Sequence, residues 1–266
     1  MQHLLIPTDF SPAADCALAY GQALASAYGA KVTLAYIHSM PMDPMRIGAP
    51  SADLYQDGEV MLERLAAELR AGGLEVATEV QLGTPVARLK SIIHKQGIDL
   101  VVMGCQGRHY VPTQLFGSTT TALMDEVRTP ILAVPLAYEP ALPRRIVWAV
   151  DGKVPSGTAG LEPLLELAER SDQELQVFHY RQEDEPALPA AKFKELLADV
   201  PYDIYVRMDE GETVERAIRD FVDKLGADLV ALIHRRSGWL NRLVVASATR
   251  RTVLTSPVPV LILQAR

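Results

Sequence analysis

Three glycines and a run of hydroxyl side chains lie in one short segment, MGCQGRHYVPTQLFGSTTTALMDEV, residues 103–127. An apolar, strand-like run precedes the first glycine, and a helix-like pattern follows the last one. Glycine at a strand end lets the backbone approach a ligand closely and adopt positive φ, and successive exposed N–H groups form an anion-binding nest. The N-terminus of a helix also favours a phosphate. The segment therefore predicts a cradle for a di- or triphosphate.

Individual positions of this segment have distinct expected roles. Gly104 ends the strand, and Gly117 with Ser118 begins the helix whose first N–H groups would face a phosphate. Ser118 and Thr119 add hydroxyl donors, and Arg108 adds positive charge from the rim. The alternative is that the glycines only form turns and the hydroxyls only cap the helix.

Two residues on earlier strands extend this hypothesis. Open parallel sheets bind ligands at the carboxyl ends of their strands, where the connections diverge to opposite faces. Asp9 lies at such an end, where a carboxylate can accept a hydrogen bond from a ribose or base, or hold a metal; alternatively, it only caps a turn. Ile37 ends the second strand and offers an apolar contact for a base. The combination of three strand ends favours a ligand site.

Strands and helices alternate along the first half of the chain. Ser11-Pro12 and Thr84-Pro85 are typical helix starts, with a capping residue before proline, and Gly29 and Gly97 are suited to close the same helices. This alternation predicts an α/β fold, a mainly parallel sheet with helices on both faces. Strands are predicted at 3–9, 31–38, 74–83, 99–104 and 129–135, and helices at 13–28, 59–69, 85–96 and after 117.

One segment does not fit the alternation. Residues 39–58 contain three prolines and no clear period, and they are predicted to form a long loop, a candidate lid. A helix resumes at about residue 59, where Met61, Leu65 and Leu69 recur at four-residue spacing. The loop is the only segment long enough to build a substrate pocket, and it carries no paired carboxylates and no nucleophile–base set.

The second half of the chain repeats the first. GETVERAIRDFVDKLGADLVAL is similar to GTPVARLKSIIHKQGIDLVVM, and SPVPVLIL is similar to VRTPILAV. From the fourth strand onward the offset is a constant 129 residues, which aligns Asp99 with Asp228. We therefore predict two tandem domains, residues 1–138 and 144–266, joined by a proline-bearing linker.

Composition narrows the possible partners and cofactors. The 266 residues carry a formal net charge of −7, which argues against a nucleic-acid partner held by phosphate contacts. Cys16 and Cys105 are far apart and the six histidines are scattered, so neither a disulfide framework nor a metal site is expected. Neither a signal-peptide pattern nor an apolar run of membrane length occurs. We expect a cytoplasmic protein.

The glycine spacing is the most specific feature of the sequence. Gly104, two residues, Gly107, nine residues and Gly117-Ser118 form neither a Walker P-loop nor GxGxxG. The pattern resembles the G-x2-G-x9-G-S/T signature of ATP-binding members of the universal stress protein family, and IPTDFSP and TPILAVP are similar to that family's first and last strands.

This resemblance implies two Rossmann-like five-stranded domains that pair through their last strands, PILAVP with PVLILQ, and it leaves a homodimer open. The implied ligand is ATP, with or without Mg, although ADP and AMP are also compatible. By the same resemblance, Pro7, Thr8, Asp9 and Ile37 would line the adenine and ribose, and Met103, Gly104, Gly107, Arg108, Gly117, Ser118 and Thr119 the ribose and phosphates.

The second copy departs from the signature. In place of the three glycines, the 129-residue offset places Ile233, Arg236 and Ala246. Side chains at these positions would occupy the space of a phosphate. We therefore predict that the second domain does not bind ATP in this mode and serves as a structural pairing partner. The alternative is a different anion site formed by Arg235, Arg236, Arg250 and Arg251.

Three functions are compatible with these observations. The first is a stress-response or signalling protein in which bound ATP alters contacts with a regulatory protein partner; without an evident general base, at most slow hydrolysis is expected. The second is an adenine-nucleotide hydrolase. The third is a docking module for a protein or small ligand, without nucleotide, using residues such as His109 and Tyr110.

Overall fold

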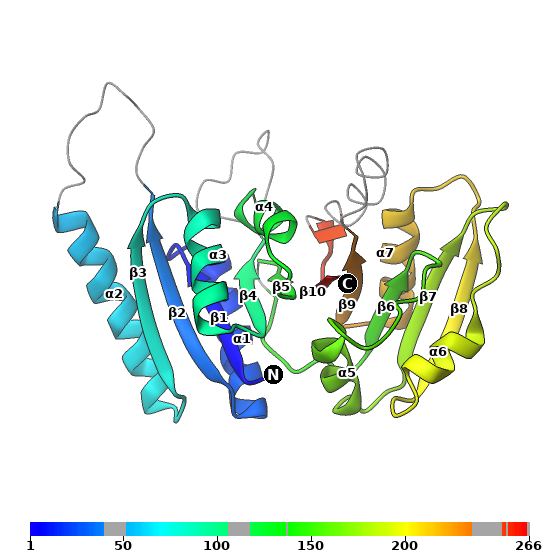
Figure 1. Ribbon diagram of the computed structural model, residues 1–266, viewed down its shortest axis with the longest axis horizontal. Helices are drawn as coiled ribbons and strands as arrows, with labels where there is room; N and C mark the ends of the chain where they lie inside the picture. The colour runs from blue at the N-terminus through cyan, green and yellow to red at the C-terminus, as the bar shows by residue number, and fades with distance from the viewer. Residues whose placement is uncertain (40–51, 106–117, 137, 236–251, 254, 265–266) are drawn as a thin grey trace, which may run out of the picture. The chain divides into compact units, whose positions relative to one another are not determined.

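The computed structural model describes residues 1–39, 52–105, 118–136, 138–235, 252–253 and 255–264 (Figure 1). The chain divides into two compact units, of which the first comprises residues 1–129 and 139–141 and the second comprises residues 130–138 and 142–266. No helix within the described ranges has the length and apolar character that crossing a membrane requires.

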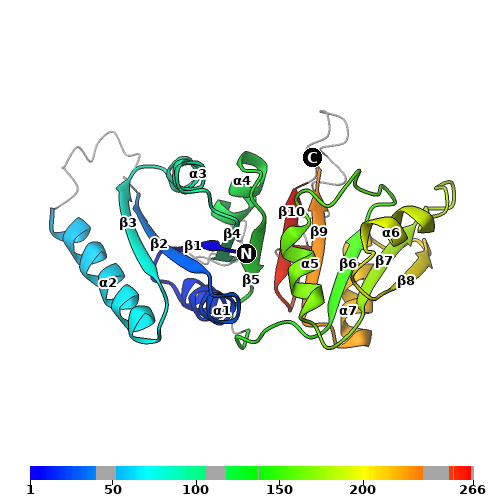
Figure 2. The ribbon, with the colours of Figure 1, turned by 60° about the horizontal axis from the view of Figure 1, so that its bottom comes forward.

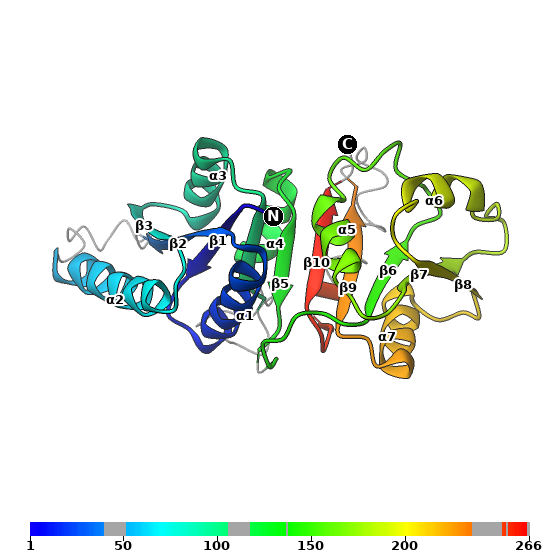
Figure 3. The same ribbon diagram turned by 90° about the horizontal axis from the view of Figure 1, so that it is seen from below.

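The first unit is a parallel sheet with strand order β3-β2-β1-β4, so the strand order reverses between β1 and β4. Helices α1 and α2 cover one face of these strands, and α3 and α4 cover the other (Figure 3). The elements are β1 His3–Thr8, α1 Pro12–Tyr28, β2 Lys31–His38, α2 Ala52–Ala71, β3 Val76–Leu82, α3 Pro85–Gln96, β4 Leu100–Gly104 and α4 Ser118–Glu126.

The predicted helix boundaries of α1 and α3 are confirmed. The Ser11 side chain accepts a hydrogen bond from the Ala14 N–H, and Gly29 closes α1 in the left-handed conformation. Gly97 closes α3 in the same conformation, whereas Thr84 precedes the helix without a side-chain capping bond. The first N–H groups and the last carbonyl groups of a helix have no partner within the helix. The Ser11 side chain binds one such N–H group, and the left-handed glycines donate to carbonyl groups of the last turn.

The prediction of a loop through residue 58 is wrong, because α2 begins at Ala52. Gly58 lies inside this helix, where an added β-carbon would collide with the ring of Tyr36 on β2. The glycine therefore allows close packing of helix on strand and does not form a turn. The buried stripe also differs from the expected one: it comprises Leu62, Ala66 and Leu69, whereas Met61 is 45% exposed. The first part of the predicted loop, residues 40–51, is outside the described residues.

The second unit is a six-stranded sheet with order β5-β10-β9-β6-β7-β8. The strands from β10 to β8 are mutually parallel, and β5 pairs antiparallel with β10, with Ile131 opposite Ile262. Helices α6 and α7 cover opposite faces (Figure 2). The elements are β5 Ile131–Val134, β6 Ile146–Val150, α5 Glu162–Glu169, β7 Leu175–Arg181, α6 Ala190–Leu196, β8 Tyr202–Met208, α7 Val214–Leu225, β9 Leu229–His234 and β10 Val260–Gln264.

The two aligned aspartates perform the same task in their respective units. Asp99 Oδ2 accepts hydrogen bonds from the backbone N–H groups of Gln2, at 2.8 Å, and His3, at 2.9 Å, where β1 begins. Asp228 accepts from the backbone N–H groups of Arg144, at 3.0 Å, and Arg145, at 2.9 Å, just before β6. The sequence repeat thus corresponds to a repeated hydrogen-bond arrangement between the first and fourth strands of each copy.

Candidate functional site

The candidate site of the first unit begins at the turn that follows β1. Thr8 is buried and its Oγ1 accepts from the Phe10 N–H at 2.9 Å, while Asp9 Oδ1 accepts from the Ser11 N–H at 3.1 Å. Phe10 has a positive φ of 57°, which is unusual for a residue with a side chain. The two side-chain bonds hold this turn in place, and Asp9 is exposed at the carboxyl edge of the sheet.

Gly104 joins the end of β4 to the first turn of α1. A β-carbon at position 104 would lie 2.6 Å from the carbonyl oxygen of Ala13, a distance that no ordinary packing permits. Gly104 is not among the described glycines with positive φ. The expectation of positive φ at this glycine is therefore wrong, and the close approach of two backbone segments is the reason that the structure gives for it.

A hydroxyl of the serine–threonine run fixes α4 to the same strand end. Thr120, which is 1% exposed, donates from Oγ1 to the carbonyl oxygen of Gly104 at 2.9 Å. Ser118 is the first residue of α4, and Thr119 is partly exposed beside it. The ends of β1 and β4 and the starts of α1 and α4 are thus connected through short contacts at one edge of the sheet.

Several predicted site residues are placed at this edge by the strands themselves. Pro7 and Thr8 lie opposite Ala35 and Tyr36 in the β1–β2 register, and Ile37 follows directly on β2. Ile37 is partly exposed, whereas Met103 of β4 is 5% exposed and belongs largely to the core. Gly107, Arg108 and Gly117 lie outside the described residues, so their predicted phosphate contacts stay predictions.

An aromatic group beside Thr8 was missed by the sequence analysis. The ring centroids of Phe10 and Tyr36 are 4.9 Å apart, and the Tyr36 hydroxyl oxygen lies 3.2 Å from Nδ1 of His38. Phe10 lies two residues after the end of β1, and Tyr36 lies opposite Thr8 on the neighbouring strand β2, which brings the two rings close together. The signal in the sequence was an aromatic residue close to the end of each of two predicted strands.

The corresponding edge of the second unit holds an internal ion pair. Arg235, which follows β9, donates from Nε to Asp151 Oδ2 at 2.8 Å and from Nη2 to the carbonyl oxygen of Lys153 at 2.5 Å. The side chains are 19% and 27% exposed. Asp151 follows β6 as Asp9 follows β1, so in the second unit a guanidinium of the same chain binds the carboxylate at this position. Ile233 lies on β9 as expected, and the other positions of the alternative arginine site are outside the described residues.

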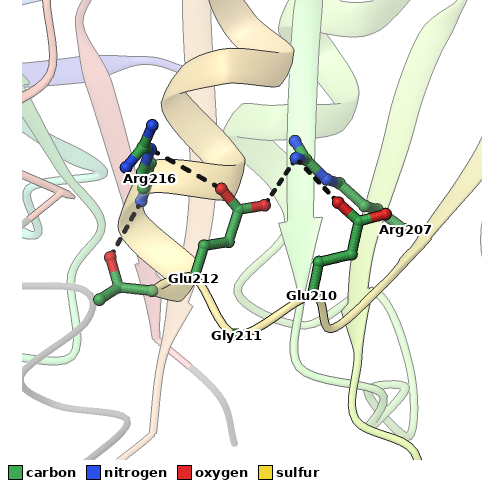
Figure 4. Close-up of a pocket in the computed structure, with 6 residues that line it drawn as sticks. Arg207, Glu210, Gly211, Glu212 and Arg216 are labelled. Carbon is green, nitrogen blue, oxygen red and sulfur yellow. Dashed lines mark hydrogen bonds and ion pairs between the residues drawn. The ribbon is translucent and has the colours of Figure 1, made fainter.

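A shallow hollow of about 430 Å³ lies where β8 leads into α7 (Figure 4). Glu212 lies between two arginines there, with Oε1 at 2.7 Å from Arg207 Nη2 and Oε2 at 3.9 Å from Arg216 Nε, and Glu210 is 3.9 Å from Arg207. The Thr213 hydroxyl accepts from the Arg216 N–H at the start of α7. Opposite charges compensate one another within this group, and we assign it no bound ligand.

Cys105, which follows Gly104, is expected to react slowly with electrophiles. Burial raises the pKa of its thiol to about 11, and the residue is 3% exposed. At pH 8 only about one molecule in a thousand then carries the thiolate, which is the reactive form. Brief iodoacetamide treatment followed by mass spectrometry should modify the more exposed Cys16 first. Faster labelling of Cys105 in the folded protein would contradict this and support a redox role.

Comparison with known proteins identifies the fold. The chain is 23% identical over 150 residues to universal stress protein MJ0577 of Methanocaldococcus jannaschii, covering 49% of this chain and 93% of that protein. A universal stress protein from Archaeoglobus fulgidus matches with a TM-score of 0.78 at 17% identity, covering 98% of both chains. A universal stress protein solved in complex with cAMP is 21% identical over 51% of this chain and 98% of that one, with a TM-score of 0.41.

Two segments of the chain, residues 1–135 and 143–264, match the family model described as universal stress protein family. Together they cover nearly all of the sequence, and each contains one copy of the repeat. The chain therefore belongs to the universal stress protein family, as a tandem pair of its domains.

Proposed function

We propose that the first unit binds an adenine nucleotide, with ATP as the principal candidate, and that the bound state regulates contact with a protein partner in a stress response or signalling pathway. The observation that carries this proposal is the spacing of Gly104, Gly107 and Gly117-Ser118 directly after β4. Backbone N–H groups in such a segment, together with the start of α4, suit a chain of phosphates.

The position of the segment in the sheet supports the proposal. The strand order of the first unit reverses between β1 and β4, and α1 and α4 lie on opposite faces. Such a reversal opens a crevice at the carboxyl ends of the two strands, which is where open α/β sheets bind ligands. Asp9 and Gly104 lie at this edge, the first suited to a ribose hydroxyl and the second at the beginning of the glycine segment.

The apolar side of the crevice suits a base. Ile37 is partly exposed near the end of β2. Tyr36, whose ring pairs with that of Phe10, directly precedes Ile37 on the same strand. Aromatic and aliphatic side chains of this kind provide stacking and dispersion contacts for a planar ring. In this arrangement Pro7, Thr8 and Ile37 contact the adenine, and the Phe10–Tyr36 pair lies near them beside the ends of β1 and β2.

The proposed activity is binding, with hydrolysis slow at most. A general base must lie within hydrogen-bond reach of the attacking water. The candidate at the end of β1 is Asp9, whose Oδ1 already accepts a hydrogen bond from the Ser11 N–H. In the second unit, the Asp151–Arg235 ion pair and Ile233 occupy the corresponding strand ends. We therefore propose one nucleotide per chain.

The experiment is to identify any nucleotide that copurifies with the protein and to titrate the stripped protein with Mg-ATP, ADP, AMP and cAMP by calorimetry. We expect a stoichiometry near one. Gly117→Val adds a branched side chain where the backbone should approach the phosphates, and it should weaken binding at least about tenfold.

The matched control is Ala246→Val, which introduces the same side chain at the aligned position of the second copy and should leave affinity and stoichiometry unchanged. Two nucleotides per chain, or loss of binding in the control, would contradict the assignment of one site to the first unit. If none of the four nucleotides binds, the glycines form turns only. Rapid steady-state release of phosphate from ATP would instead favour the hydrolase.

A further inference from the structure

Strand β8 ends the sheet of the second unit and has an unusually apolar free edge. Among the strands that the structure describes, none lies beyond β8. Tyr205, Val206 and Met208 are 40%, 49% and 46% exposed, although all three are large hydrophobic residues. Tyr205 lies on the face of the strand that meets Phe221 of α7, and Val206 and Met208 lie on the opposite face, so exposed hydrophobic side chains flank this edge on both faces.

This edge carries few of the devices that keep natural edge strands apart. Such strands usually carry charged residues (above all lysine), proline or a bulge that prevents pairing with another chain, and β8 has only Asp203 and Arg207. The sequence YDIYVRM contains neither lysine nor proline, and its register with β7 is unbroken from Tyr202 to Met208. The helix that precedes β8 is also short: α6 has seven residues, whereas α2, which precedes and packs on the corresponding strand β3, has 20.

The backbone direction shows which residues offer hydrogen bonds to a partner. The carbonyl oxygen of Pro201 accepts from Leu175 N–H, and Asp209 N–H donates to the carbonyl of Arg181, so residues 201 and 209 face β7. Because backbone groups alternate along a strand, the odd-numbered residues between them face β7 as well. The N–H and C=O groups of Tyr202, Ile204, Val206 and Met208 therefore point outward.

The sequence of β8 complements itself when it is reversed. In an antiparallel pairing of two copies centred on Tyr205, Asp203 of each copy lies opposite Arg207 of the other, and Ile204 of each lies opposite Val206 of the other. In this register outward-facing residues meet outward-facing residues, as an antiparallel ladder requires. Registers centred on residue 203 or 207 would instead place two like charges opposite each other, which is destabilising.

The charged side chains of β8 are available for this pairing. Glu210 and Glu212 both contact Nη2 of Arg207, and its guanidinium forms no other ion pair with the part of the chain that the structure describes, so other N–H donors are open. Asp203 lies beside Glu174, whose pKa it raises through a hydrogen bond and charge repulsion. A cation from a second copy would relieve this repulsion.

We propose that β8 is the interface through which two copies of this chain associate, antiparallel and edge to edge about a two-fold axis at Tyr205. The strand β3 of the first unit does not offer the same match. Its one charged residue is Glu79, which already accepts from the side chains of Gln81 and Gln96. The interface is small, and small interfaces associate weakly, so the dimer should form reversibly with concentration.

Cysteine cross-linking tests the register directly. In the proposed dimer the two β-carbons of residue 205 face each other as a non-hydrogen-bonded pair, about 4.5–5.5 Å apart. Tyr205→Cys should therefore give a disulfide-linked dimer under mild oxidation. Val206→Cys, the matched control, faces Ile204 of the other copy and should not cross-link, and wild type reports any background from Cys16. A folded Tyr205→Cys protein that stays monomeric, or equal cross-linking of both variants, overturns the proposal.

Sedimentation over a concentration series tests the contacts. The wild-type mass should rise toward twice 29.1 kDa, and Val206→Pro, which removes an outward N–H from each copy, should weaken association at least about tenfold. Asp203→Arg and Arg207→Asp should each weaken the dimer, and the double variant should restore it. Circular dichroism checks that each variant is folded. A wild-type protein that is monomeric at all concentrations, or a dimer unaffected by Val206→Pro and by both charge reversals, overturns the proposal.

Discussion

We expect the replacement of Gly104 by alanine to lower the free energy of unfolding of the first unit by about 3 kcal/mol. This value is the upper end of the usual cost of overpacking a close contact. The new β-carbon would lie 2.6 Å from Ala13 O and 2.7 Å from the Ala13 carbonyl carbon. Both are backbone atoms at the start of α1, so no side chain can rotate to relieve the contact. The end of β4 and the first turn of α1 have to separate.

Hydrogen exchange followed by mass spectrometry measures this loss where it occurs. Amides of α1 and β4 should exchange faster in Gly104→Ala, while those of β6 and β9 keep their protection, because local opening reflects local stability. Gly157→Ala is the matched control: an added β-carbon there would have no other atom within 4 Å, and the φ of Gly157 is not positive. That variant should be as stable as wild type or slightly more stable. Unchanged exchange in Gly104→Ala would contradict the packing role of this glycine.

The second large effect is expected at Asp228. Its carboxylate accepts from the backbone N–H groups of Arg144 and Arg145 and ties the start of β6 to β9. Asp228→Ala should lower the free energy of unfolding of the second unit by about 2 kcal/mol, since hydrogen bonds to a charged acceptor are among the stronger ones. Chemical denaturation followed by exchange of the β6 amides measures the change.

Two further variants separate this role from charge alone. Asp99→Ala removes the same arrangement in the first unit and should have a similar effect there. Asp172→Ala removes an exposed ion pair with Arg144, 3.1 Å long, and should cost less than about 0.5 kcal/mol. If Asp172→Ala is as destabilising as Asp228→Ala, the surface charge of Arg144 matters more than the backbone contacts.

Most of the fold follows from local signals. Proline after a capping residue and glycine after the last turn define α1 and α3, and continuous apolar runs define β4 and β9 because both faces of their sheets are covered. The start of α2 could not be found in this way. Gly58 and the prolines before it resemble a loop, and the reason for this glycine is the ring of Tyr36, which belongs to another element.

The candidate site was predictable in its place and less so in its contacts. Strand ends and glycine spacing locate the edge at which Asp9 and Gly104 lie. The contact that requires glycine at position 104, with Ala13, joins segments about ninety residues apart in sequence, and no spacing rule indicates it. The ion pair of Asp151 with Arg235 could not be predicted from spacing either. From the sequence alone, Arg235 was equally compatible with an anion-binding site and with an ion pair inside the chain.

The pairing of β5 with β10 has a consequence for folding. Ile131 and Ile262 lie in different halves of the sequence, yet they are opposite each other in one sheet. A contact between distant residues is slow to form because a long loop must close first. As the polypeptide emerges from the ribosome, the edge of β5 that β10 will occupy stays open throughout synthesis of the second repeat. During that interval a chaperone, or another nascent chain, can bind the strand before its own partner exists.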